Sequence, residues 1–401
     1  MAYKTSFRFL WIGQSLANSG DLLLIVSMIA LVFEATKSPF YMAMIPFFVT
    51  ISKLCGGLVA PVFVDRFNLK LLLAYSQLGK TLLLGFLVFM VSVMHFNLYI
   101  LFLCIIGLFL LDGLATPARN SMLPLLVPSS ELIKANSLLS IVDQCIQLGG
   151  WALSGVLLAF IGVNNVLALT GMLFTVSTIF MFCLTMPPNK QSKEKHTSRL
   201  TVLKEGWVYI WNHTTTRILL LLDFIDSLAN VVWIAAILYI YVDEALGASK
   251  QWWGYINASF FVGMIIGSFI TLKLTETLQA NFRRFISIGA ISMGTFTLLF
   301  GVAHSPWLAL LFSCLFGMAA QIKGITQHTL LQTITPSEFL PKVFSAQVVI
   351  VSGTFGLSSL LFGYMTEVLG VRFVFIIAAL LFYSMSFVIT VYKLETASHS
   401  N

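Results

Sequence analysis

Long apolar runs alternate with short polar breaks along almost the whole 401-residue chain. Most runs contain about 20 or more residues, enough for a helix to cross a hydrocarbon layer of about 30 Å. The runs predict membrane spans at 9–33, 40–64, 71–94, 98–118, 135–162, 165–187, 216–242, 252–278, 284–303, 306–329, 342–368 and 371–392. Backbone amides in lipid must be satisfied within their own segment, so these runs predict an all-α membrane protein with twelve transmembrane helices.

One longer polar interruption, over residues 187–217, falls close to the middle of the chain and leaves six spans on either side. We therefore predict an N-terminal six-helix bundle over 1–187, a cytoplasmic linker over 188–215 and a C-terminal six-helix bundle over 216–401. Within the linker, apolar side chains among basic residues over 200–212 predict a short amphipathic helix on the inner membrane surface.

Composition also indicates a lipid environment, since 58% of the residues are hydrophobic and only 10% are charged. Soluble domains are nearer half apolar and a quarter charged. The net charge of +7 would suggest a nucleic-acid partner in a soluble protein. Here most of the basic residues lie in the predicted loops between membrane spans, where membrane orientation accounts for them. We therefore expect no nucleic-acid partner.

Lysines and arginines outside the spans predict the orientation, because these residues are retained on the cytoplasmic side. With the N-terminus inside, only Lys37, Lys250 and Arg372 lie outside. The cytoplasmic set is Lys4, Arg8, Arg66, Lys70, Lys134, Lys190, Lys193, Lys195, Arg199, Lys204, Arg217, Lys273, Arg283, Arg284, Lys342 and Lys393. We therefore predict that both termini are cytoplasmic and that the first span is retained.

Short matches between the two halves predict an internal duplication. Residues 128–134 (PSSELIK) resemble 336–342 (PSEFLPK), and Ser-Leu-Ala-Asn occurs at both 15–18 and 227–230. These and neighbouring matches keep the same order at offsets of 207 to 212 residues. Duplicated bundles are common in secondary transporters, although duplication also occurs in membrane proteins that transport nothing.

The loop between the second and third spans, residues 61–70 (PVFVDRFNLK), resembles the loop signature of the major facilitator superfamily. The resemblance implies two pseudo-symmetric six-helix bundles, with Asp65 latching against a helix N-terminus when the cytoplasmic side is shut. A carboxylate gains roughly 0.3–1 kcal/mol in such a position. Arg66 and Lys70 would be the local charge partners of Asp65; alternatively, they only retain the loop inside.

Two further stretches resemble the macrolide-efflux branch of that superfamily. They are residues 117–128 (PARNSMLPLLVP) and the Gly-Gln and Gly-Asp pairs within 13–21. This resemblance implies a drug:proton antiporter that exports hydrophobic or amphipathic compounds.

Charged residues inside the spans are the main candidates for function, because each costs at least about 2.5–3.5 kcal/mol at a helix centre. They are Asp21, Asp112, Asp143, Asp223, Asp226, Lys53, Lys80, Arg119 and Lys323. We expect them to pair or to face a polar cavity, except that Arg119 could reach the inner surface with its long side chain.

Gln14, Asn18 and Asp21 occupy one face of the first span, at spacings of four and three residues. We interpret this face as part of a substrate-cavity wall. The alternative is a buried ion pair between Asp21 and Lys53, in which each charge lowers the cost of burying the other.

Asp223 and Asp226 are three residues apart in the seventh span, with Asn230 one turn further. Two carboxylates so close repel each other when both are ionised, so one should bind a proton more readily. With Asp143 and Asp21, they are our proton-coupling candidates. The alternative is static pairing with a lysine on another helix, either Lys80 or Lys323.

Asn230, Trp233 and Gln147 complete the predicted substrate cavity. The chain has no phosphate-binding loop, zinc motif or nucleophile motif, so we predict no enzyme activity, cofactor or metal. We expect a monomeric, proton-coupled exporter of small molecules in the plasma membrane. Uptake of a nutrient, export of a siderophore or lipid, and a non-transporting sensor remain alternatives.

Overall fold

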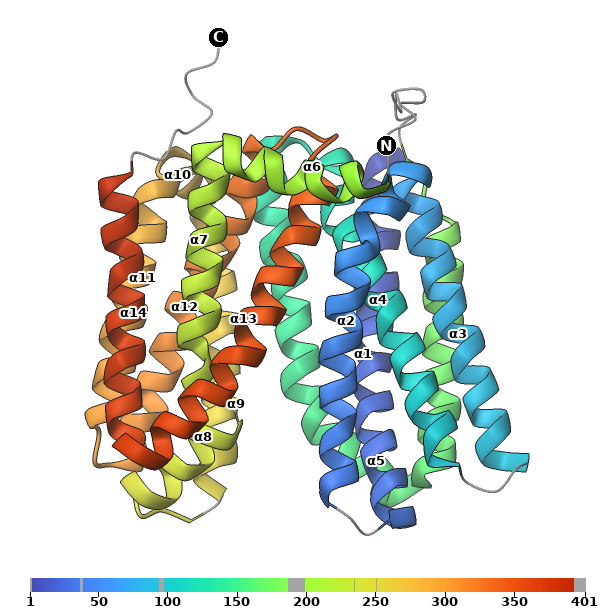
Figure 1. Ribbon diagram of the computed structural model, residues 1–401, viewed down its shortest axis with the longest axis horizontal. Coiled ribbons are helices and arrows are strands. Elements are labelled where there is room, and N and C mark those ends of the chain that lie inside the picture. Colours follow the sequence, from blue (N-terminus) through green and yellow to red (C-terminus); the bar gives the residue numbers. More distant parts are fainter. Residues whose placement is uncertain are drawn as a thin grey trace. The chain divides into compact units, whose positions relative to one another are not determined.

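A computed structural model describes residues 2–36, 39–93, 97–186, 199–233, 235–249 and 251–392 (Figure 1). Every regular element over these ranges is helical, which confirms the predicted all-α class. Residues 188–198 of the predicted linker lie outside the described residues.

Five long helices make up the first half of the chain. They are α1 (Ala2–Thr36), α2 (Pro39–Arg66), α3 (Leu69–Val93), α4 (Leu98–Leu126) and α5 (Leu132–Phe182), with a short 3-10 turn, η1 (Ser129–Glu131), before the last. The 51-residue α5 is broken at Gly162, whose φ of 75° and ψ of 163° lie outside the helical region. Glycine tolerates this positive φ, and the predicted spans 135–162 and 165–187 lie on the two sides of the break.

The second half contains more and shorter elements. They are α6 (Arg199–Asn212), α7 (Thr214–Ala229), η2 (Asn230–Trp233), α8 (Ala235–Ile240), η3 (Tyr241–Ala245), α9 (Gln251–Lys273), α10 (Thr275–Ala280), α11 (Phe282–Val302), α12 (Pro306–Ile334), α13 (Leu340–Leu369) and α14 (Val371–Val391). Helix α6 covers the amphipathic helix that we predicted over 200–212.

Ten helices of the described residues are long and apolar enough to cross a membrane. An eleventh span follows if the bent pair Thr214–Trp233 and Ile237–Ala245, which meet at 41°, crosses as one unit. The seventh predicted span is therefore broken rather than continuous. The first part of α5 accounts for the remaining predicted span, so the chain is a multi-pass membrane protein.

The chain forms two compact units, and each includes a segment from the opposite half. Unit 1 comprises residues 1–128, 145–209 and 337–349. Unit 2 comprises residues 129–144, 210–336 and 350–401. The exchanged segments are the regions around the starts of α5 and α13, which the repeat relates at an offset of 208 residues (337 − 129).

Glycines allow one pair of helices in each unit to approach very closely. In unit 1, α2 packs against α4, and a Cβ on Gly56 would collide with the carbonyl oxygen of Leu110. In unit 2, α9 packs against α12, and a Cβ on Gly263 would collide with the carbonyl oxygen of Cys314. Small residues at membrane helix interfaces permit this backbone contact.

We expect Gly56→Ala to lower the stability of the protein by about 1–3 kcal/mol, because the added methyl forces α2 away from α4. Gly85→Ala on α3 is the matched control, since a Cβ there meets nothing within 4 Å. Thermal unfolding of the purified protein in detergent measures both variants. Equal midpoints for the two variants would mean that the close α2–α4 contact is unimportant for stability.

Candidate functional site

A layer of polar residues crosses unit 1 between two apolar clusters. One cluster includes Leu24 on α1, Leu84 on α3 and Phe109 on α4. The other includes Leu10, Leu73 and Ala115 on the same three helices. Asp21, Lys80 and Asp112 fall between these positions on α1, α3 and α4 respectively. The polar layer is therefore enclosed by apolar side chains on both sides along each helix.

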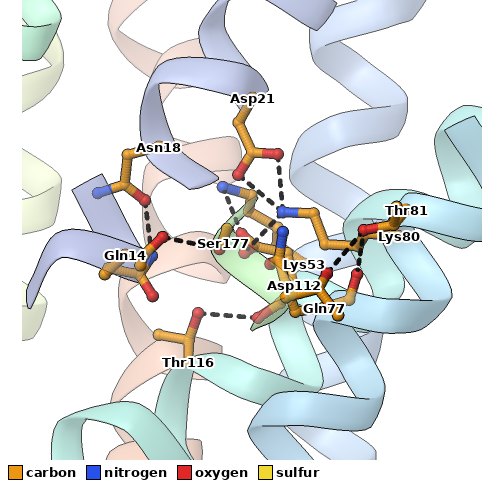
Figure 2. A network of polar contacts seen from close by, with 12 residues as sticks. Gln14, Asn18, Asp21, Lys53, Gln77, Lys80, Thr81, Asp112, Thr116 and Ser177 are labelled. Carbon is orange, nitrogen blue, oxygen red and sulfur yellow. Dashed lines mark hydrogen bonds and ion pairs between the residues drawn. The ribbon is translucent and has the colours of Figure 1, made fainter. Parts of the chain in front are cut away.

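Four helices contribute one charged residue each to an ion network in this layer (Figure 2). The Nζ atom of Lys80 lies 2.7 and 2.8 Å from the two carboxylate oxygens of Asp21, and 3.3 Å from Oδ1 of Asp112. The Nζ atom of Lys53 lies 2.9 Å from Oδ2 of Asp112. The order Asp21–Lys80–Asp112–Lys53 thus alternates in sign, and the formal charges of the four residues cancel.

Burial differs along the network. The Lys80 side chain is 2% exposed and the Asp21 side chain 12%, whereas the Lys53 side chain is 40% exposed. Aromatic rings flank both lysines, with Phe174 5.1 Å from Lys80 Nζ and Phe109 5.3 Å from Lys53 Nζ. Burial of a charge is tolerated only with such partners, so the Lys80 end of the network is the strongly desolvated one.

Glycines next to two of the charged residues let the helices approach closely at the network. Gly113 follows Asp112, and a Cβ there would collide with the backbone carbonyl of Lys53, so the α2–α4 contact brings these two side chains together. Gly20 precedes Asp21, and a Cβ there would lie 2.6 Å from the ring of Phe174. Gly113 was not among the residues predicted from the sequence, although a glycine next to an embedded charge is a readable signal.

On α1, two of the three polar residues predicted to share a face contact each other. Gln14 donates from Nε2 to Oδ1 of Asn18 at 2.7 Å, one turn before Asp21. The alternative pairing of Asp21 with Lys53 is wrong, because Asp21 pairs with Lys80. Lys53 pairs instead with Asp112, since α2 packs directly on α4.

Unit 2 has a smaller polar cluster between α7 and α12. Lys323, whose side chain is 2% exposed, lies with Nζ 3.4 Å from Oδ2 of Asp226. Gln327, one turn further on α12, donates to Oδ1 of Asp223 at 2.8 Å and to the carbonyl oxygen of Leu219 at 3.0 Å. Asp223 and Asp226, which we predicted to share one face of their helix, therefore both contact side chains of α12, one turn apart.

Trp233 lies in an aromatic cluster of unit 2, with its ring 4.2 Å from Phe316 and 4.6 Å from Phe300 between centroids. Its Nε1 atom is buried and has no hydrogen-bond partner among the described residues. Asn230 begins the 3-10 turn that leads to Trp233. A buried indole N–H usually has a partner, so this donor is a point at which a ligand could bind.

Three other predicted residues lie on α4 and α5. On α5, Asp143 is half-buried and belongs to unit 2, whereas Gln147 is exposed and belongs to unit 1. Arg119 is half-buried on α4 and donates from Nε to Oδ1 of Asn120 at 3.4 Å.

Asp65 has a different ion partner from the ones that the resemblance implied. Its Oδ1 atom lies 2.9 Å from Nζ of Lys342, near the start of α13, rather than pairing with Arg66 or Lys70 among the described residues. Arg66 is exposed, and the backbone N–H of Lys70 donates to Oδ1 of Asn68 at 3.0 Å. The loop carboxylate therefore does meet the N-terminal end of another helix, but through a lysine side chain.

Lys342 also pairs with Glu205 of α6, so two carboxylates share one lysine with a side chain only 4% exposed. Helix α6 lies directly against the backbone here, because a Cβ on Gly206 would lie 2.9 Å from the carbonyl oxygen of Lys342. One turn further, Tyr209 stacks on Phe339 with centroids 4.6 Å apart. Glu205 was not predicted from the sequence, because it carries no signal beyond its place in an amphipathic helix.

The helical architecture, the embedded charge network and the loop carboxylate define a membrane transporter. The chain matches the family described as Transmembrane secretion effector over residues 2–401. It is 32% identical over 372 residues to the uncharacterized MFS-type transporter YfmI of Bacillus subtilis, covering 92% of this chain and 91% of YfmI. The chain therefore belongs to the major facilitator superfamily.

A further relative and two solved structures agree with this assignment. The enterobactin exporter EntS of Shigella dysenteriae is 25% identical over 298 residues, covering 72% of this chain and 68% of EntS. The human organic anion transporter MFSD10 has a TM-score of 0.80 at 11% identity, covering 97% of this chain and 100% of that one. The Escherichia coli fucose:proton symporter FucP has a TM-score of 0.77 at 13% identity, covering 98% and 99%. These two structures share the fold.

Proposed function

We propose that this transporter exports hydrophobic or amphipathic compounds by alternating access, driven by proton entry. The observation that carries the proposal is the buried network of Asp21, Lys80, Asp112 and Lys53. Ionisable residues within membrane spans mark proton or substrate pathways. The family description as a secretion effector supports export rather than uptake.

Within the network, Asp21 is the acid that can bind a proton with the least disruption. It is the terminal member and pairs with Lys80, whereas Asp112 pairs with both Lys80 and Lys53. When Asp21 binds a proton, Lys80 keeps a carboxylate partner in Asp112. A protonated Asp112 would instead leave Lys53 without its carboxylate partner. Protonation of Asp21 thus changes the charge of the layer from zero to +1 and weakens the connection between α1 and α3.

The cluster of unit 2 supplies the second set of proton candidates. One oxygen of Asp226, Oδ1, is buried without a hydrogen-bond partner among the described residues, so it can accept a proton without breaking a described bond. Asp223 and Asp143 complete the set. Gln14, Asn18, Asn230, Trp233 and Gln147 remain our candidates for contact with the substrate.

A second candidate function is the export of a siderophore. An enterobactin exporter is among the relatives, and its similarity extends over 72% of this chain. Both candidates need an outward-directed cycle, so they differ in substrate and not in mechanism.

We further propose that the protein acts as a monomer in the plasma membrane, with both termini in the cytoplasm. The excess of lysine and arginine in the predicted cytoplasmic loops supports this orientation. Protonation from the outside would then accompany release of the substrate.

Transport by the purified protein in lipid vesicles tests the proposal. An imposed pH gradient should drive accumulation of at least one compound from a set of cationic dyes, macrolides and siderophores, with proton movement followed by an internal pH-sensitive dye. Proton flux should appear only when the transported compound is present. If no compound in the set moves and no proton flux is detected, the proposal fails and a sensor becomes the better interpretation.

A further inference from the structure

A recess of about 580 Å³ opens beside the start of α11 in unit 2. Its walls come from α11 and from the end of α14, two helices that lie side by side (Figure 1). Arg283, Arg284, Ser287 and Thr390 contribute polar groups, and Phe282 and Ile389 contribute apolar surface. The residues that line the recess are separate from the charge clusters described above.

Among the described residues, the basic side chains of the recess have no anionic partner. Arg283 donates from Nη2 to the carbonyl oxygen of Thr390 at 3.0 Å, and Arg284 is exposed. Neither guanidinium takes part in the ion pairs that join described residues. Both lie in the first turn of α11, which has no acidic residue. Positive charge is disfavoured at this end of a helix, so an anion bound here would offset an unfavourable arrangement.

The surface that continues from the recess is apolar. On α11, Ile288 lines the recess and is 47% exposed, and Ile291 one turn away is 44% exposed. On α14, Phe387 is 70% exposed. A small inorganic anion would use only the arginines, whereas a ligand with an anionic head and hydrocarbon chains would use both parts of the surface.

We propose that this recess binds the headgroup of an anionic phospholipid, whose acyl chains lie along the exposed apolar side chains of α11 and α14. Arginine forms paired hydrogen bonds with phosphate oxygens, and basic pockets between membrane helices suit anionic headgroups. With the predicted orientation, which places Arg283 and Arg284 inside, the lipid comes from the cytoplasmic leaflet. The site requires only the membrane fold, so it stands or falls separately from the proposed transport cycle.

Lipid titration of the full chain in detergent tests the proposal. Dioctanoyl phosphatidylglycerol, dioctanoyl phosphatidylcholine and inorganic phosphate are each added, and the thermal unfolding midpoint is recorded, because a ligand that binds the folded state raises it. We expect a saturable rise with phosphatidylglycerol and a much smaller one with the other two. The double variant R283Q/R284Q should bind phosphatidylglycerol at least about tenfold more weakly, a difference of about 1.4 kcal/mol.

The control variant K134Q/K273Q removes two exposed basic residues that unit 2 carries outside the recess, and it should bind as the wild type does. Arg284→Gln alone should also weaken binding, and this exposed side chain has no described bond whose loss would unfold the protein. Equal binding of phosphatidylcholine would overturn the proposal, as would equal binding of inorganic phosphate, which would indicate a free anion. If the control variant bound phosphatidylglycerol as weakly as R283Q/R284Q, the proposal would also be overturned, because binding would then depend on the total positive charge and not on the recess.

Discussion

Replacing Asp21 by asparagine should reduce proton-driven transport to the level of empty vesicles while the protein still folds and inserts. The asparagine cannot carry a proton through the cycle, but its amide oxygen can still accept a hydrogen bond from Lys80. Lys80 also keeps a carboxylate partner in Asp112 at 3.3 Å, and the layer then carries the same +1 charge as with a protonated Asp21. Transport driven by a pH gradient in vesicles is the measurement, with thermal unfolding of the same sample as the check on folding.

Asp112→Asn is the informative comparison, because its expected defect is of a different kind. Asp112 contacts both lysines, at 2.9 and 3.3 Å, and its loss leaves Lys53 without its carboxylate partner. Losing one partner of a charged hydrogen bond costs about 1–3 kcal/mol, and Lys53 is 40% exposed, so we expect this variant to lose stability by that order as well as transport. If Asp21→Asn retained transport coupled to the pH gradient, Asp21 would not be the proton carrier.

The sequence predicted the helices and the charged residues well, because hydrophobic length and the cost of a charge in lipid are local properties. The pairing of those charges depends on tertiary contacts, which the sequence does not contain. The alternative that we derived from depth in the membrane, an Asp21–Lys53 pair, is therefore wrong. The structure pairs Asp21 with Lys80, because Gly56 and Gly113 hold α2 on α4 and thereby direct Lys53 to another acid.

The partner of Asp65 was also not predictable from the sequence, because the two residues of this ion pair are far apart in the chain. A resemblance in residues 61–70 identified Asp65 as a latch, and Asp65 does meet the start of another helix. The identity of its partner, Lys342, and the participation of Glu205 could not be inferred, since nothing in either local sequence indicates that the start of α13 packs in unit 1. The seventh span likewise looks continuous by hydropathy, although the helices Thr214–Trp233 and Ile237–Ala245 meet at 41°.

The second large effect is expected at Lys342. Replacing it by methionine preserves the length of the side chain but leaves Asp65 and Glu205 facing each other without a cation. Loss of one partner of a charged hydrogen bond costs about 1–3 kcal/mol, and here two such bonds are lost. We expect a lower thermal unfolding midpoint and a lower transport rate, since α6 and the start of α13 are held through this lysine.

Variants of Asp65 and Glu205 test whether these two carboxylates share Lys342 as their common ion partner. Asp65→Asn and Glu205→Gln each leave Lys342 with one anion, so each should have a smaller effect than Lys342→Met. The double variant D65N/E205Q should lose more stability than the sum of the two single losses, because only the double variant leaves the buried lysine unpaired. Lys204→Met, which removes an exposed charge from the same helix, should leave both the unfolding midpoint and the transport rate unchanged. Strict additivity of the two single losses would show that the carboxylates act independently and that Lys342 does not join the end of α2 to α6.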